Sequence, residues 1–136
     1  MKMKKDHWIP ASRQVLELLE VIRPLTGGET YIFPSRNYGA RNGGHMTEGA
    51  LTMALKRMGY AGQHVGHGFR STFKTLATVA RRPDGGDMWS HDAIELQQAH
   101  EVGSRVERAY FRGDRWQERV ALMGWWSDYL DELRGH

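Results

Sequence analysis

Four side chains in the sequence, those of His67, Arg70, His100 and Tyr110, can together act on a phosphate ester. A phenol can attack phosphorus and form a covalent intermediate. A planar guanidinium can hold the oxygens of a phosphate through two hydrogen bonds. An imidazole titrates near neutral pH, so it can donate hydrogen bonds to the same oxygens or exchange a proton with the phenol. Each of these residues alone is most often a packing or surface residue, and only their combined order and spacing indicates a site.

The tyrosine needs neighbouring cations to act as a nucleophile. The unperturbed pKa of a phenol is about 10, so the group is mostly neutral at pH 7 and positive charge must favour the phenolate as it attacks. Arg70 can also bind the negative charge that develops on the non-bridging oxygens of the transition state. Such chemistry requires no metal, because cations and hydrogen-bond donors stabilise the charge, and we expect no cofactor.

A mainly helical chain is predicted to position these residues. Apolar residues recur at helical spacing in five segments, 12–23, 47–58, 67–80, 92–99 and 115–134, and a further short helix is expected to carry Tyr110. Stretches that contain glycine, proline or asparagine predict loops at 35–46, 59–66 and 81–90. Residues 1–10 have the pattern of the turn and return strand of a β-hairpin that ends at Pro10.

The ends and inner faces of these helices can also be predicted. Ser12 and Thr47 are expected to cap the first two helices, and Asp92 with Glu95 has the spacing of a capping box. Pro24 and the glycines after it are expected to end the first helix near residue 23. The side chains expected to face inward from the third helix are Phe69, Phe73, Leu76, Ala77 and Ala80.

The composition is that of one folded domain. The chain has 136 residues, 40% of them hydrophobic, which is enough for one core. No apolar run approaches the ~20 residues of a membrane span, and no secretory signal is present. The absence of cysteine excludes disulfides and thiolate metal sites, which fits a cytoplasmic protein. The net charge of +3 permits nucleic-acid binding without requiring it.

Taken together, the motifs resemble those of the tyrosine recombinases of the phage-integrase family, in particular the prophage integrases that insert at tRNA genes. The resemblance covers nearly the whole chain through the stretches "YIFPSR", "ALKRMGY", "HGFRSTFKTLA", "DAIELQQAH", "AYFR" and "WWSDYLDEL". It implies a mainly α (α+β) fold, the DNA breaking-rejoining enzyme fold of the catalytic domain. That fold is a helical bundle with a small β-hairpin or sheet at its N-terminus.

The resemblance also assigns roles to residues. Tyr110 matches the nucleophile, and His67 with Arg70 matches the H-x-x-R motif. His100 matches the later histidine of an "LAH" signature, although Gln98 stands where that signature has leucine. The catalytic lysine of the hairpin turn falls on Lys2, with Lys4 and Lys5 left open because the turn can slip. The loop at 81–90 is longer than is usual in this group.

The activity implied is site-specific recombination that integrates or excises a prophage or genomic island through a 3′-phosphotyrosine intermediate. The implied partners are double-stranded DNA at attachment sites, further copies of the protein in a tetrameric synapse, and DNA-bending and directionality factors, all in the bacterial cytoplasm at the nucleoid. The basic residues expected to contact DNA are Lys4, Lys5, Arg36, Arg41, Arg105 and Arg108.

Residues 1–136 are expected to be an incomplete catalytic domain. In the family a first catalytic arginine precedes the hairpin, and an N-terminal DNA-binding domain precedes that; neither is found in this sequence. Loss of one preorganised donor typically lowers a rate by ~10²–10³. We therefore expect weak or no recombinase activity from the chain by itself.

Two alternative interpretations use the same residues differently. In the first, the chain is a degenerate recombinase or a helical DNA-binding module without catalysis. The break at 59–66 is longer than the tight turn of a helix-turn-helix, however, and this interpretation gives Tyr110 no role. The second is a metal site built from His64, His67, His91 and His100. The glycines on both sides of His67 disfavour a rigid helical pair of ligands there, and no H-E-x-x-H motif is present.

Overall fold

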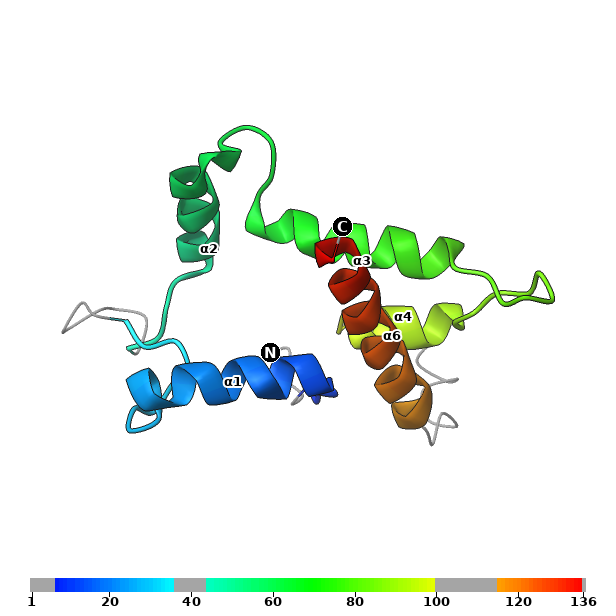
Figure 1. The fold of residues 1–136 in the computed structure, drawn as a ribbon, viewed down its shortest axis with the longest axis horizontal. Helices are drawn as coiled ribbons and strands as arrows, with labels where there is room; N and C mark the ends of the chain where they lie inside the picture. The colour runs from blue at the N-terminus through cyan, green and yellow to red at the C-terminus, as the bar shows by residue number, and fades with distance from the viewer. Residues whose placement is uncertain (1–6, 36–43, 100–114, 136) are drawn as a thin grey trace, which may run out of the picture. The chain divides into compact units, whose positions relative to one another are not determined.

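The computed structural model describes residues 7–35, 44–99 and 115–135, and these residues are mainly helical, as predicted. The helices are α1 (Arg13–Thr26), α2 (Glu48–Leu55), α3 (Gly66–Val79), α4 (His91–Gln97) and α6 (Trp116–Arg134), and a π-helical turn, η1 (Lys56–Tyr60), follows α2 (Figure 1). No strand occurs among the described residues, where antiparallel pairing is limited to two isolated bridges. Residues 7–10 are therefore not part of a strand there, and residues 1–6 of the predicted hairpin lie outside the described part.

The chain divides into two compact units. One consists of residues 1–13 and 73–136, and the other of residues 14–72. The division falls inside α3, between Thr72 and Phe73. For brevity we call the first the outer unit, because it contains both ends of the sequence, and the second the inserted unit.

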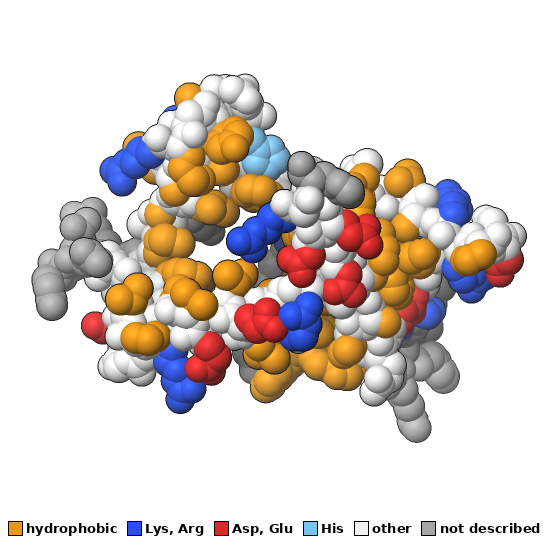
Figure 2. Space-filling model, in the orientation of Figure 1, with side chains coloured by type: hydrophobic (Ala, Val, Ile, Leu, Met, Phe, Trp, Pro, Cys, Tyr) orange, Lys and Arg blue, Asp and Glu red, His pale blue; other side chains and the backbone are white. Residues whose placement is uncertain are grey.

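In the inserted unit, α1 runs further than predicted. Pro24 lies inside the helix instead of ending it, and the helix continues to Thr26. Proline lacks only one N–H donor, and the last turn is closed by Gly27, whose N–H donates to the Arg23 carbonyl at 2.7 Å. No α1 side chain is buried: Leu18, Val21 and Leu25 are 62%, 71% and 81% exposed. Figure 2 shows hydrophobic side chains on the surface of α1.

The base of the predicted loop at 35–46 is closed by backbone pairing. Pro34 and His45 form an antiparallel bridge. Beside it, the Ser35 N–H donates to the Gly44 carbonyl at 2.7 Å and the Met46 N–H to the Phe33 carbonyl at 2.9 Å. These bonds hold the two ends of the loop together, while residues 36–43 lie outside the described part.

Helix α2 begins where the sequence predicted, directly after Thr47. The Thr47 side chain makes no capping hydrogen bond, however, and its backbone carbonyl instead accepts from the Ala50 N–H at 3.0 Å. Beyond α2, Gly59 ends the helical run because its φ of +95° is a conformation that glycine adopts readily and other residues rarely. The predicted break at 59–66 is confirmed in part: Tyr60 still belongs to η1 and Gly66 already to the next helix, which leaves residues 61–65 between them.

In the outer unit, α4 packs beside α6 around a small core (Figure 1). The core residues are Phe73, Ala77, Ala93, Ile94 and Leu122, and Trp89, Met123, Trp125 and Trp126 pack around them. The inward positions predicted for Phe73 and Ala77 are confirmed, whereas Phe69 is 50% exposed. Phe69 packs instead edge-on against the His64 ring, with the ring centroids 4.5 Å apart.

Helix α4 is capped by Ser90 instead of Asp92. The Ser90 hydroxyl accepts a hydrogen bond from the Ala93 N–H at 3.2 Å. Asp92 lies in the first turn of the helix and pairs with Arg115, whose Nη2 is 3.3 Å from the Asp92 carboxylate. The cap predicted from spacing was therefore wrong by two residues, because a distant arginine binds the carboxylate that was expected to cap.

Candidate active site

The described part of the candidate site is the first two turns of α3. His67 and Arg70 are three residues apart on this helix, so their side chains lie on one face, one turn apart. Both side chains are exposed. An exposed imidazole and guanidinium on one helix face can bind neighbouring oxygens of one phosphate.

The backbone on the N-terminal side of His67 is held by α2. The Gly66 N–H donates to the Thr52 hydroxyl oxygen at 3.1 Å, so a side chain of α2 satisfies one of the free N–H groups at the start of α3. A Cβ at position 66 would lie 3.2 Å from Leu51 Cδ2, closer than ordinary van der Waals contact. The glycine therefore allows α2 to approach α3 next to His67.

The backbone on the other side of His67 is covered by the ring of His64. A Cβ at Gly68 would lie 2.6 Å from Cε1 of that ring and 3.0 Å from each of its nitrogens. His64 Nε2 is buried and has no hydrogen-bond partner among the described residues. The two glycines beside His67 thus have a packing role, whereas their residue type alone indicated only a less rigid helix. The spacing of His64 and Gly68, four residues apart, is the signal that indicates this contact.

A second group of contacts joins the start of the chain to the end of α4. His7 Nε2 lies 3.2 Å from the backbone carbonyl oxygen of Gln97. The buried Arg119 of α6 donates from Nε to the Gln97 side-chain oxygen at 3.0 Å and from Nη2 to the Trp8 carbonyl oxygen. Nearby, the buried hydroxyls of Ser127 and Ser12 are hydrogen bonded at 2.7 Å. Residues 7–12 are therefore attached to α4 and α6.

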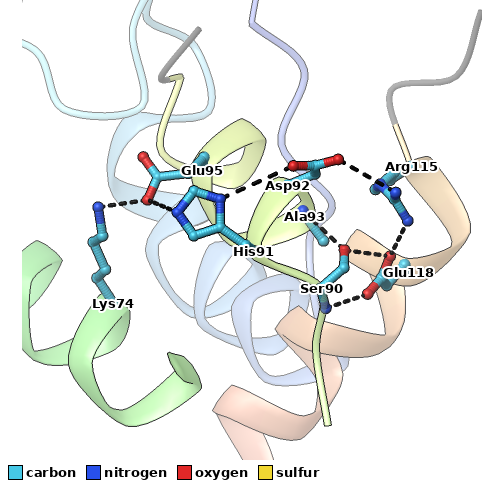
Figure 3. Close-up of polar contacts among 8 residues, drawn as sticks. All are labelled: Lys74, Ser90, His91, Asp92, Ala93, Glu95, Arg115 and Glu118. Atoms are coloured by element: carbon cyan, nitrogen blue, oxygen red, sulfur yellow. Dashed lines mark hydrogen bonds and ion pairs between the residues drawn. The ribbon is translucent and has the colours of Figure 1, made fainter. Parts of the chain in front are cut away.

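A third group of contacts surrounds the start of α4 (Figure 3). The Ser90 N–H and hydroxyl donate to the two carboxylate oxygens of Glu118 at 2.7 and 2.9 Å, and Arg115 donates to Glu118 at 3.2 Å. Burial alone would raise the pKa of Glu118, but the hydrogen bonds from Ser90 and Arg115 and the charge of Arg115 together hold that pKa below its usual value. Glu118 is thus an anion that fixes the first turn of α6 to Ser90, the cap of α4.

Glu95 connects α4 to α3 within the outer unit. Its carboxylate, 11% exposed, lies 2.5 Å from Lys74 Nζ and 3.7 Å from His91 Nε2 (Figure 3). Two potential cations therefore face one nearly buried carboxylate, which fits the rule that buried charges are paired. Among the described residues no group of three or more His, Asp or Glu side chains is arranged to hold a metal ion.

The remaining predicted site residues lie outside the described part of the chain. They are Lys2, Lys4, Lys5, Arg36, Arg41, His100, Arg105, Arg108 and Tyr110. The structure does, however, describe chain positions close to three of them in sequence. His7 follows Lys2 by five residues and is bound to Gln97, which precedes His100 by three. Arg115 follows Tyr110 by five residues and is bound to Asp92 at the other end of α4.

Curated proteins similar to this chain are integrases. The chain is 39% identical over 130 residues to the prophage integrase IntA of Escherichia coli, and the matched region covers 96% of this chain and 29% of that protein. It is 37% identical over 137 residues to the integrase of Enterobacteria phage P4 (98% of this chain, 29% of that protein) and 35% identical over 133 residues to the integrase of Shigella phage Sf6 (97% and 32%). No family model matches the chain, and no solved structure does.

This chain is therefore homologous to the phage and prophage integrases over nearly its full length. The resemblance to the integrases of the tyrosine recombinase family is thereby confirmed. The chain spans about 30% of the length of these relatives. No helix in the described residues is both long and apolar enough to cross a membrane.

Proposed function

We propose that residues 1–136 form part of the C-terminal catalytic domain of a tyrosine site-specific recombinase, which integrates or excises a prophage or genomic island at attachment sites in double-stranded DNA. The homology to integrases supports DNA as the substrate class. In this proposal the complete protein acts as a tetramer on two DNA sites, with DNA-bending and directionality factors as partners in the bacterial cytoplasm.

The proposed reaction is a transesterification. The phenolic oxygen of Tyr110 forms a bond to the phosphorus of the DNA backbone and loses its proton, while the bond between phosphorus and the 5′ oxygen breaks. Lys2 gives the departing 5′ oxygen a proton. Arg70 and His67 bind the non-bridging oxygens, and His100 binds the same oxygens or accepts the phenol proton. The reverse attack by a 5′ hydroxyl of the partner strand restores the backbone and frees the tyrosine.

One observation carries this proposal beyond the homology. His67 and Arg70, the pair proposed to bind the non-bridging oxygens, lie three residues apart on α3, and both side chains are exposed on one face of that helix. An imidazole and a guanidinium one helical turn apart can bind two oxygens of the same phosphate. A packing role would require these two side chains to be buried, and neither of them is.

Covalent capture of DNA tests the proposal. The chain would replace the matching segment of the phage P4 integrase, and the hybrid would be incubated with a nicked substrate of that phage's attachment site, on which cleavage cannot be reversed. We expect a covalent protein–DNA product that Tyr110→Phe abolishes while DNA retention in a gel is unchanged. The matched control is Tyr60→Phe, since Tyr60 is a half-exposed tyrosine of η1 and should still give the product.

The alternative of a DNA-binding module without catalysis predicts a different result. In that case the hybrid would be retained by the DNA, but it would form no covalent product in either the unmutated or the Tyr60→Phe form. Capture that persists in Tyr110→Phe would show that another residue is the nucleophile.

A further inference from the structure

We infer that Arg119 is a positioning residue for the site proposed above: it joins the segment that follows Lys2 to the end of α4 that precedes His100. The inference rests on the proposed function for the roles of Lys2 and His100. It rests on the structure alone for the anchor itself, which consists of Arg119, Gln97, Trp8 and His7.

The anchor is built around a buried charge. Arg119 is 3% exposed, and a guanidinium is unfavourable in such a place unless its N–H groups are paired. Its Nε donates to the Gln97 side-chain oxygen at 3.0 Å and its Nη2 to the Trp8 carbonyl oxygen. Its Cζ also lies 5.6 Å from the centre of the Trp116 ring, a cation–π contact within α6.

The two acceptors belong to segments that are far apart in sequence. Trp8 is 111 residues from Arg119, and Gln97 is 22 residues from it. Gln97 makes a second link between the same segments, because its backbone carbonyl oxygen lies 3.2 Å from His7 Nε2. One glutamine is therefore tied to the N-terminal segment directly through His7 and indirectly through Arg119.

The geometry of the guanidinium suits this role better than a lysine would. Its N–H donors lie in a rigid plane, so two acceptors bound by one guanidinium are held at a fixed separation and orientation. A methionine of similar length could fill the same space without burying a charge, which is often neutral or favourable for stability. What the arginine adds is a fixed placement of two chain segments relative to each other.

Hydrogen–deuterium exchange on the chain itself tests the anchor without requiring activity. In Arg119→Met we expect the amides of residues 8–9 and 98–99 to exchange about tenfold faster or more, the factor expected for loss of a charge-assisted hydrogen bond. Amides of the core helices around Phe73 and Leu122 should exchange as before. Arg119→Lys should resemble Arg119→Met, because one ammonium group cannot reproduce the two planar N–H donors of the guanidinium.

Two further variants keep this test decisive. Gln97→Met breaks the same link from its other end and leaves Arg119 in place, so it decides the question if Arg119→Met fails to fold. Arg81→Met is the control, since Arg81 forms a surface ion pair with Asp87 at 3.1 Å and should change neither segment. Unchanged exchange at either segment, or a uniform rise over the whole chain, would overturn the inference.

A leaving-group experiment in the hybrid integrase links the anchor to the chemistry. A substrate with sulfur in place of the bridging 5′ oxygen needs no proton donor, because a thiol, with a pKa of about 8.5, leaves readily as the anion. On ordinary DNA we expect Arg119→Met to slow single-turnover cleavage by ~10² or more, the contribution of a general acid. On the sulfur substrate its rate should return to within about tenfold of the unmutated hybrid, as should that of Lys2→Ala.

The outcomes separate the inference from the function. Equal loss on both substrates in Arg119→Met, with rescue of Lys2→Ala, would leave the proposed function standing and overturn the positioning role. No cleavage of either substrate by the unmutated hybrid would overturn the proposed function, and the exchange experiment would still decide whether Arg119 holds the two segments.

Discussion

Replacing Gly68 with alanine tests the packing of His64 against the first turn of α3. The new methyl group would lie 2.6 Å from Cε1 of the His64 ring, so the ring must move by roughly 1 Å to reach ordinary contact. The ring cannot move alone, because it packs edge-on against Phe69 at a centroid distance of 4.5 Å. Overpacking of this kind costs about 1–3 kcal/mol, and the better helix propensity of alanine returns at most about 1 kcal/mol. We expect a net loss of about 1–2 kcal/mol.

Urea unfolding followed by two signals measures this loss. All five tryptophans lie in the outer unit, so their fluorescence reports on that unit, whereas circular dichroism reports on the helices of both. We expect the dichroism transition of Gly68→Ala to shift to lower urea. Gly49→Ala is the matched control, because Gly49 is also in the first turn of a helix and a Cβ there meets nothing within 4 Å.

The His64→Ala background provides the decisive comparison. Without the ring, Gly68→Ala should be neutral or slightly stabilising, which gives a coupling energy of about 1–2 kcal/mol between the two positions. If Gly68→Ala stabilises the unmutated chain as much as Gly49→Ala does, the ring does not lie over the helix and the reasoning is refuted.

Two other predictions concern the outer unit. Ser12→Ala should cost about 1–3 kcal/mol, because the Ser127 hydroxyl stays buried and loses its hydrogen bond of 2.7 Å, and Ser127→Ala should cost less in the Ser12→Ala background than alone; additive losses in urea unfolding would contradict the pairing. The pKa of Glu118 is lower in the folded chain than in the unfolded one, so the stability from this carboxylate is present at neutral pH and is lost as the pH falls from about 5 through the folded-state pKa. Glu118→Gln should show a shallower loss of unfolding free energy between pH 7 and 3, and parallel curves for the two proteins would show that other carboxylates cause the acid sensitivity.

Local features of the sequence predicted most of the helical architecture. The periodicity of Phe73 and Ala77 placed the inner face of α3 correctly, and the start of α2 directly after Thr47 was also predicted correctly, although the Thr47 side chain makes no capping hydrogen bond. These features depend on neighbours within one or two turns, which a sequence displays directly. The H-x-x-R spacing likewise placed His67 and Arg70 on one helix face.

Features that depend on distant partners were not predicted. Ser90 replaces Asp92 as the cap of α4 because Glu118, 28 residues later, binds the Ser90 backbone and hydroxyl. Nothing in residue type or spacing distinguishes Arg119 from an ordinary surface cation, and only the tertiary structure shows it buried against Trp8. Pro24 indicated the end of α1 but was accommodated within its last turns. The roles of such residues depend on contacts with residues far away in the sequence, and these contacts cannot be predicted from residue type and spacing.

The division of the chain into two units also has a consequence for the order of folding during synthesis. Residues 14–72 form the inserted unit from one continuous stretch, so all of its internal contacts can form once that stretch has left the ribosome. The outer unit cannot, because Ser12 must wait for Ser127, 115 residues later. Residues 7–12 therefore leave the ribosome before the inserted unit does and are among the last parts to dock, and contacts formed earlier within the inserted unit shorten the loop that this docking must close.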